Sequence, residues 1–290
     1  MGKISKLLCA SVLSASMIFG AVPSTQASTS FYDLDSEIKK AVAAYNDAEV
    51  VWIHNKNLSG INSSVEQIGQ ITYSTSDKST YVGTSELVNN TDEEQTLTTQ
   101  SFSETLSDTL ETTVEEGLSI GQEITASGEL AGIGVETSFS AEYSLSSSET
   151  TSTTTEQSYT AEAQEIVVPA NTIRNVNVFL RRTLASGKVA LDTHLTGSVK
   201  YEYVQDFDDD GFASVEEEVS IYDIFKNGVS AGYKMPSNIS LDHSTKTVKF
   251  SGVGVYTAEY GADFYVEVDD ETIIISEPTP LSPKKISMNH

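Results

Sequence analysis

The sequence predicts a mainly β protein with one helix near its N-terminus. Val, Ile and Tyr recur throughout the chain between Ser, Thr, Asn and Gly, which is typical of many strands separated by turns. Long stretches alternate apolar and polar residues with a period of two, above all residues 87–102 and 159–204. The helical spacing of apolar residues is clearest at residues 34–45.

Residues 1–27 have the features of a secretory signal peptide. Lys3 and Lys6 precede an apolar run from Leu7 to Val22, and Thr25-Gln26-Ala27 supplies small residues for a cleavage site. We therefore expect a secreted protein whose mature chain begins near Ser28. Cys9, the only cysteine, lies within this signal, so we expect no disulfide and no thiol chemistry in the mature chain.

The chain is strongly acidic, with 42 Asp and Glu residues against 17 Lys and Arg residues and a formal charge of −25. This charge repels nucleic acid and anionic lipid head groups alike, so we expect no nucleic-acid partner. Contact with a membrane then requires a receptor or a short-range hydrophobic step.

The first mature segment predicts one helix followed by short strands. The apolar face of the helix consists of Leu34, Ile38, Val42 and Tyr45. Asp33 and Asp35 are capping candidates, which predicts a helix over residues 36–47. Three short strands are predicted between residues 50 and 88. We expect residues 28–86 to form a head.

The rest of the chain divides into three parts. Residues 87–200 are expected to form long strands, including a hairpin that turns at Ser186-Gly187. Residues 201–276 predict a C-terminal β region. Three prolines mark residues 277–290 as a tail.

The most informative segment, residues 111–146, switches the parity of its apolar positions partway along. The first apolar positions are even: Val114, Leu118, Ile120, Ile124 and Ala126. Those after Gly128 are odd: Ala131, Ile133, Val135, Phe139, Ala141, Tyr143 and Leu145. Successive side chains of a strand point to opposite faces, so each run predicts a strand with one apolar and one polar side.

A turn at Gly128-Glu129 would fold these two runs into a hairpin, because a two-residue loop with glycine first is a common hairpin turn. Ile124 then faces Ile133, and both apolar sets fall on one side of the ribbon. A slip of one residue would destroy this agreement.

An amphipathic hairpin of this length fits a membrane-spanning role. A transmembrane strand needs roughly 9–11 residues, which residues 117–127 and 130–140 supply. We predict that the apolar row faces lipid. The opposite row would line an acidic lumen that favours cations, through Glu115, Glu123, Glu136 and Glu142.

Two other interpretations of the segment remain open at this point. Half-buried hairpins in soluble sheets alternate in the same way. Apolar residues from Phe102 to Leu118 also recur at a spacing of four, as on a helix, although Ser and Thr crowd the positions between them.

Trp52, Tyr73 and Tyr81 are candidates for a receptor or sugar site, although packing in the core is the more common role of such residues.

Two motifs resemble those of a known toxin family. They are Leu87-Val88-Asn89-Asn90-Thr91-Asp92 with Gln95, and Ile166-Val167-Val168-Pro169-Ala170-Asn171-Thr172. Both are similar to the aerolysin-like β-pore-forming toxins, in particular the epsilon-toxin and mosquitocidal-toxin branch. The similarity covers about residues 87–198. In that family the Ser/Thr-rich amphipathic segment between these landmarks is the inserting hairpin.

The resemblance implies an elongated, mostly antiparallel β protein of aerolysin type with a receptor-binding head. It also implies a protoxin that binds a cell-surface receptor, is clipped by a protease, and assembles into a homo-oligomeric ring before inserting into the target membrane. Lys284-Lys285 matches the place of an inhibitory terminal peptide, and Lys39-Lys40 is a second candidate cleavage site.

Insertion of such a hairpin requires an oligomer. Each unpaired backbone group in lipid costs several kcal/mol, so the open edges of a lone hairpin would cost tens of kcal/mol. Closing many hairpins into a barrel pairs those edges. In the soluble monomer the apolar row should lie against the body of the protein, because an exposed patch of that size would aggregate.

Other motifs carry less weight. Asp206, Asp208, Asp210, Gly211 and Glu217 have the spacing of a calcium loop, but a strand is predicted before them in place of a helix. Gly228-Val229-Ser230-Ala231-Gly232 fits a nucleophile elbow, but Pro236 interrupts the helix that an elbow requires. We expect no enzyme activity, no cofactor and no metal site.

The sequence therefore predicts a secreted pore-forming protoxin. The alternative is a secreted β-rich adhesin or lectin whose hairpin never leaves the body of the protein.

Overall fold

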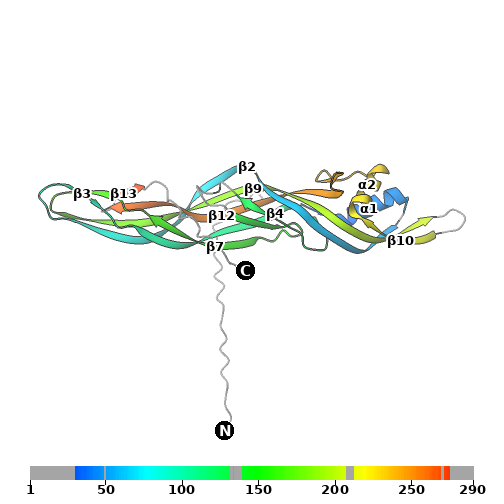
Figure 1. Cartoon of the computed structure of the whole chain (residues 1–290), viewed down its shortest axis with the longest axis horizontal. Coiled ribbons are helices and arrows are strands. Elements are labelled where there is room, and N and C mark those ends of the chain that lie inside the picture. The colour runs from blue at the N-terminus through cyan, green and yellow to red at the C-terminus, as the bar shows by residue number, and fades with distance from the viewer. Residues whose placement is uncertain are drawn as a thin grey trace, which may run out of the picture.

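The computed structural model describes residues 30–48, 50–130, 133, 139–206, 212–268 and 271–274. The fold is a long, strand-rich body with two helices at one end (Figure 1). The predicted signal peptide and the predicted tail lie outside the described residues. Of the helices that the structure describes, neither is long and apolar enough to cross a bilayer.

The helices and strands follow one another as β1 (Ser30–Asp33), α1 (Leu34–Asn46), β2 (Val50–Asn89), β3 (Gln95–Thr98), β4 (Phe102–Ser119), β5 (Thr125–Leu130), β6 (Phe139–Ser144), β7 (Thr151–Ala161), β8 (Glu165–Val168), β9 (Thr172–Asp206), β10 (Phe212–Ser220), α2 (Ile221–Ser230), β11 (Ile239–Asp242), β12 (Thr247–Val268) and β13 (Glu271–Ile274).

One nine-stranded sheet forms the body. Its longer strands lie side by side in the order β7-β4-β12-β9-β2, and each of these pairings is antiparallel. Two further sheets have two strands each: β3 pairs with β8, and β5 pairs with β6. The predicted mainly β, elongated antiparallel fold is therefore confirmed. The alternative helix from Phe102 to Leu118 is wrong, because these residues form β4.

Strands β2 and β9 are much longer than the sequence predicts. Residues 50–89 form one strand, β2, where three short strands were expected, because β9 offers it an unbroken edge. The presumed breaks are register shifts, for example between Ile61 and Ser64. Since β2 extends along the whole of β9, residues 28–86 are not confined to a head.

The hairpin expected at Ser186-Gly187 is absent, because β9 runs straight through these residues. Gly187 serves packing instead of a turn: a Cβ atom there would lie 2.6 Å from the hydroxyl oxygen of Tyr256.

The predicted N-terminal helix is confirmed as α1. Its N-cap is Asp33, whose carboxylate accepts hydrogen bonds from the backbone of Asp35 and Ser36 at 3.0 and 3.4 Å. The second helix, α2, was not predicted. It packs against α1, and Gly228 permits the close approach, because a Cβ atom there would lie 2.8 Å from that of Ala41. Ser230 is the last residue of α2, so the nucleophile-elbow geometry is absent.

The two motifs that carry the family resemblance meet at the opposite end. The buried amide of Asn89 donates hydrogen bonds to the carbonyl oxygens of Val168 and Pro169 at 2.9 and 3.0 Å. The backbone of Asn171 donates to Thr91 at 3.0 Å. This end has its own apolar core, in which side chains of β9 and β12 pack with others from β2, β7 and β8. It is separate from the larger core beneath the helices and the middle of the sheet.

Candidate functional site

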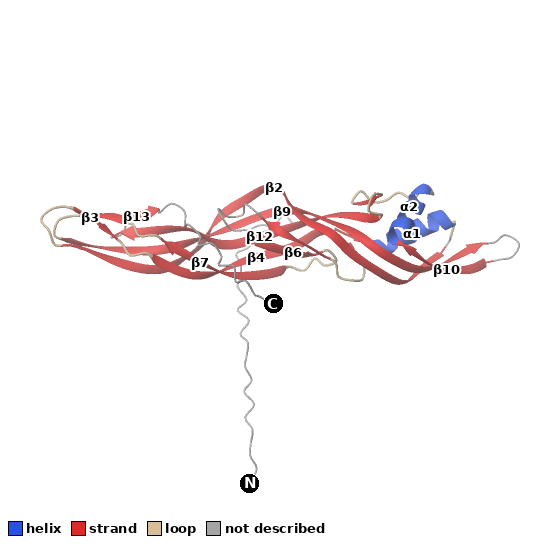
Figure 2. Cartoon of the chain, in the orientation of Figure 1, coloured by secondary structure: helices blue, strands red, loops and turns tan. Residues whose placement is uncertain are grey.

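The amphipathic segment leaves the main sheet and folds back over it. Residues 111–119 complete β4, and the chain then forms the small β5–β6 sheet before it returns as β7 along the edge of β4. We call residues 120–146 the flap, of which residues 120–130, 133 and 139–146 are described. β6 lies next to β4 near the middle of the molecule (Figure 2).

The predicted apolar row is buried in this structure. Every described member of it is at most 6% exposed: Val114, Leu118, Ile120, Ile124, Ala126, Ile133, Phe139, Ala141, Tyr143 and Leu145. Ala131 and Val135 lie outside the described residues. The expectation that the row lies against the body of the monomer is thus confirmed for all members that can be located.

Three glycines allow the flap to approach the sheet closely. A Cβ atom on Gly60 of β2 would lie 2.7 Å from Ile124, and one on Gly254 of β12 would lie 2.6 Å from the ring of Tyr143. Within the flap itself, a Cβ atom on Gly128 would lie 2.8 Å from the Cβ atom of Val65. The flap therefore covers a face to which both β2 and β12 contribute.

Polar contacts hold the flap at several points. The hydroxyl of Tyr260 donates a hydrogen bond to the carbonyl oxygen of Ile133. The hydroxyl of Thr112 donates to the carbonyl oxygen of Glu142 at 2.9 Å. The side-chain amide of Gln122 donates to the carbonyl oxygen of Leu58. Each such bond stabilises by roughly 0.5–1.5 kcal/mol, so the flap is a packed and bonded part of the monomer.

The expected turn at Gly128-Glu129 is wrong for this form. Both residues lie inside β5, where Gly128 pairs with Ala141 and Glu129 with Ser140. The expected pairing of Ile124 with Ile133 is not observed either, because Ile124 lies opposite Leu145, whose N–H donates to the carbonyl oxygen of Ile124 at 2.8 Å. The observed pairing differs from the expected one by an even number of residues. For that reason the predicted faces are right although the register is not.

The glutamates predicted to line a lumen occupy the opposite row. Glu123 and Glu142 are exposed, as is Glu129. Glu115 is partly covered and forms an ion pair with Lys188 at 2.7 Å between Nζ and Oε2. Glu136 lies outside the described residues. In the monomer this row faces solvent.

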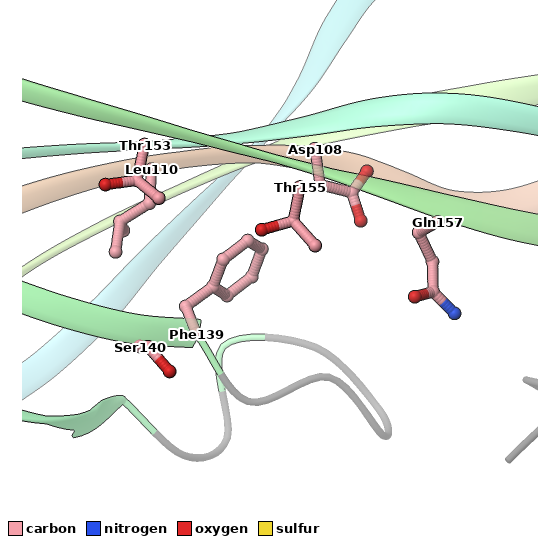
Figure 3. Close-up of a pocket in the computed structure, with 7 residues that line it drawn as sticks. All are labelled: Asp108, Leu110, Phe139, Ser140, Thr153, Thr155 and Gln157. Atoms are coloured by element: carbon pink, nitrogen blue, oxygen red, sulfur yellow. The ribbon is translucent and has the colours of Figure 1, made fainter. Parts of the chain in front are cut away.

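A pocket separates the flap from β7 (Figure 3). It is lined from β4, β6 and β7 by Asp108, Leu110, Phe139, Ser140, Thr153, Thr155 and Gln157. The side chain of Phe139 points from the flap toward the β4–β7 pair. The flap thus borders β7 across a pocket and packs tightly against β2 and β12.

Asp108 is a buried charged residue that sequence analysis missed. It is 2% exposed and accepts a hydrogen bond from the hydroxyl of Tyr159 at 2.5 Å and one from the backbone of Gly261 at 3.3 Å. Burial raises the pKa of Asp108 above its ordinary value, although these hydrogen bonds and the nearby Arg182 oppose the rise. The sequence does contain a signal for this burial, because Asp108 shares the even-numbered face of β4 with the buried residues Leu110 and Val114.

The aromatic residues considered for receptor binding are all exposed, so the expectation of core packing is wrong. Trp52, Tyr73 and Tyr81 are 45%, 51% and 55% exposed. They lie on the outer strand β2, opposite Glu202, Ala185 and Phe179 of β9. The partners of Trp52 and Tyr81 are 23 residues apart on β9, which is roughly 75 Å at about 3.3 Å per residue, so the three aromatic residues do not form one site.

The candidate cleavage sites are only partly described. Lys39 and Lys40 lie within α1, where a protease would first have to unwind the helix. Lys284 and Lys285 lie outside the described residues, as do residues 207–211 of the candidate calcium loop. Glu217 accepts a hydrogen bond from the hydroxyl of Tyr201 at 2.8 Å. No cluster of metal-binding side chains occurs among the residues that can be located.

Comparisons with known proteins identify relatives. A family model described as Clostridium epsilon toxin ETX/Bacillus mosquitocidal toxin MTX2 matches residues 39–279. A comparison of the sequence with curated proteins finds no match.

Solved structures share the fold, and three of them are similar over most of both chains. The Mpp75Aa1.1 beta-pore-forming protein from Brevibacillus laterosporus is 18% identical, with 87% of this chain and 96% of that chain covered and a TM-score of 0.61. A non-toxic crystal protein from Bacillus thuringiensis is 14% identical, with 87% and 99% covered and a TM-score of 0.61. A chain of the Cry23Aa1 and Cry37Aa1 binary protein complex is 18% identical, with 87% and 98% covered and a TM-score of 0.53. At these identities the likeness establishes the fold alone.

Proposed function

The chain belongs to the family of Clostridium epsilon toxin ETX and Bacillus mosquitocidal toxin MTX2, and on this premise we propose that it is a secreted protoxin whose flap becomes the membrane-spanning part of a pore. The protein binds a cell-surface receptor, is clipped by a protease and assembles into a homo-oligomeric ring. The flap and the adjoining parts of β4 and β7 then insert as an amphipathic hairpin and close a β-barrel with their copies.

The observation that carries this proposal is the burial of every described member of one apolar row, on a segment whose other row is polar. An ordinary surface hairpin also buries one face. This segment, however, is attached to the two outermost strands of one sheet edge, β4 and β7, which already form a long antiparallel pair. Release of the flap would extend that pair without disturbing the order β4-β12-β9-β2.

Energetics explain why the flap stays folded in the monomer. Each large apolar side chain of the row contributes about 1.5–3 kcal/mol when fully buried, and in water a released flap would lose this contribution. In a bilayer the same side chains remain buried against lipid, and barrel closure pairs the backbone groups at both edges. Insertion is therefore favourable only for an assembly at a membrane.

Receptor binding and activation involve other parts of the chain. Trp52, which pairs with Glu202 near the helical end, is the candidate for receptor contact, because Tyr73 and Tyr81 lie far along β2. Lys284-Lys285 is the preferred activation site, because Lys39-Lys40 is held in α1. Secretion follows from the predicted signal peptide.

An engineered disulfide between the flap and β2 tests the proposal. A Cβ atom at Gly128 would lie 2.8 Å from that of Val65, about 1 Å short of the usual disulfide spacing, so β5 and β2 have to separate by about 1 Å when the bridge forms. We expect trypsin-treated Val65→Cys/Gly128→Cys protein to release no dye from cells that the wild-type protein permeabilises. Reduction should restore dye release.

The two single variants are the controls and should leak with or without reductant. Leakage by the double variant while mass spectrometry shows the disulfide intact would refute the proposal. The adhesin alternative predicts binding to cells without dye release and without a detergent-resistant high-mass band, for the wild-type protein as well.

A further inference from the structure

Leu145 takes part in two different strand registers at once. Its carbonyl oxygen accepts a hydrogen bond from the backbone N–H of Leu118 at 2.8 Å. Its own N–H donates to the carbonyl oxygen of Ile124, also at 2.8 Å. In a regular antiparallel pair both bonds of such a residue go to the same partner. Here the two partners are six residues apart in the chain.

The partner Leu118 belongs to the register of β4 and β7. That register pairs Phe102 with Ala161 and Thr112 with Thr151, and its continuation places Leu118 opposite Leu145. Cross-strand hydroxyl pairs mark the same register along the outer edge. They join Ser103 to Thr160 at 2.8 Å, Thr105 to Ser158 at 2.9 Å, and Thr113 to Thr150 at 2.8 Å, the last just beyond the end of β7.

The partner Ile124 belongs to the register of the flap. Strands β5 and β6 pair Thr125 with Ser144 and Leu130 with Phe139, which places Ile124 opposite Leu145. The difference between the two registers is taken up by the chain between Leu118 and Ile124. This stretch leaves the strand conformation and turns at Gly121, whose φ of 72° is in the left-handed region that favours glycine.

The chemistry of the flap suits the β4–β7 register as well as its own. Continued through the flap, the β4–β7 register would place Ile120 opposite Tyr143, Ile124 opposite Phe139, and Leu130 opposite Ile133. Glu123 would face Ser140 on the polar side. A shift of six residues is even, so every side chain keeps its face, and large apolar residues still meet across the strands.

We infer that the membrane hairpin adopts the β4–β7 register, and that the Gly121 loop, residues 119–124, takes up the six-residue offset between the two registers until insertion. When the flap leaves the sheet, this loop straightens, and β4 and β7 extend as one ladder in the register they already have. The β5–β6 pairing is thereby replaced, and Ser140 exchanges its partner Glu129 for Glu123. This inference rests on the proposed function, because the extended ladder forms only during insertion.

Two matched cysteine pairs that share Ser140 test the register. Glu129→Cys/Ser140→Cys joins residues paired in the soluble form, and Glu123→Cys/Ser140→Cys joins residues paired only in the extended ladder. All three positions are exposed, and each variant loses one glutamate, so their effects on folding should match. Ser127→Cys/Glu142→Cys repeats the soluble register at a second exposed pair.

Oxidation of the soluble protein should cross-link the Glu129–Ser140 and Ser127–Glu142 pairs and leave the Glu123–Ser140 pair reduced. Oxidation of oligomers formed on susceptible membranes from reduced protein should give the opposite result. Oligomers that permeabilise membranes but cross-link Glu129 to Ser140 would overturn the register inference and leave the proposed function intact. If the reduced variants and the wild-type protein form no pore, both proposals fail together.

Discussion

Gly254 of β12 lies directly beneath the ring of Tyr143, so close that a Cβ atom on Gly254 would stand 2.6 Å from Tyr143 Cε1. A methyl group cannot occupy that space unless the ring or the strand moves. The contact joins the middle of the sheet to the flap, and it makes the fit of the flap sensitive to a single carbon atom.

We predict that Gly254→Ala loosens the flap. Overpacking of a filled core costs about 1–3 kcal/mol, and here the strain falls on the contact between flap and sheet. Urea unfolding should show a lower free energy of unfolding, and limited proteolysis should cut within the flap sooner than in the wild-type protein. Thr257→Ala, at an exposed position of the same strand, is the control and should change neither result.

Tyr143→Phe should act in the opposite direction. The hydroxyl of Tyr143 is buried and has no hydrogen-bond partner among the described residues, and burial raises its pKa above the ordinary value. Removing an unsatisfied buried hydroxyl should raise the free energy of unfolding by about 1 kcal/mol. Tyr256→Phe is the comparison, since its hydroxyl donates to Gln67 at 2.7 Å and its loss should destabilise the protein. Equal effects of the two variants would contradict this account.

Asp108→Asn should change how stability depends on pH. The folded state holds the Asp108 carboxyl in a buried site that raises its pKa, so the folded protein binds this proton more readily than the unfolded chain does. Wild-type stability should therefore rise, relative to that of the variant, as pH falls from 7 toward the unfolded pKa of about 3.9. Urea unfolding of both proteins at several pH values measures the difference. A difference that stays constant with pH would show that Asp108 does not titrate in this range.

Glu123→Gln/Glu142→Gln should weaken cation selectivity of the pore. Both side chains lie on the polar row and are exposed in the monomer, so folding should be little affected. Each subunit would lose two negative charges from the lumen, and the reversal potential in a salt gradient across a planar bilayer should move toward zero. Glu149→Gln, beyond the flap, is the control. A wild-type pore that prefers anions would exclude the lumen assignment.

The burial of the flap was predictable from sequence, whereas its register was not. Alternation with a period of two fixes which side chains share a face, so Ile124 and Tyr143 were assigned correctly to the buried side. The same pattern is unchanged by any even slip. It could not distinguish pairing of Ile124 with Ile133 from the observed pairing with Leu145, which depends on contacts with a distant part of the sheet.

Glycines are ambiguous in sequence for a related reason. Gly128 and Gly187 predict turns, but both lie inside strands where a neighbouring side chain leaves no room for a Cβ atom. A glycine required by close packing and one required by a turn look alike in sequence. Helix α2, in contrast, has a local sequence signal, because Ser220 caps it and Ile221, Ile224 and Phe225 fall on one buried face.

Strand β9 is 35 residues long, roughly 115 Å at about 3.3 Å per residue, and it is continuous from the helical end to the opposite end. The body therefore has no joint at which one end could swing relative to the other. A molecule tethered by its helical end would present the flap at a fixed height above the tether. Subunits that stand side by side on a surface would therefore hold their flaps at the same height.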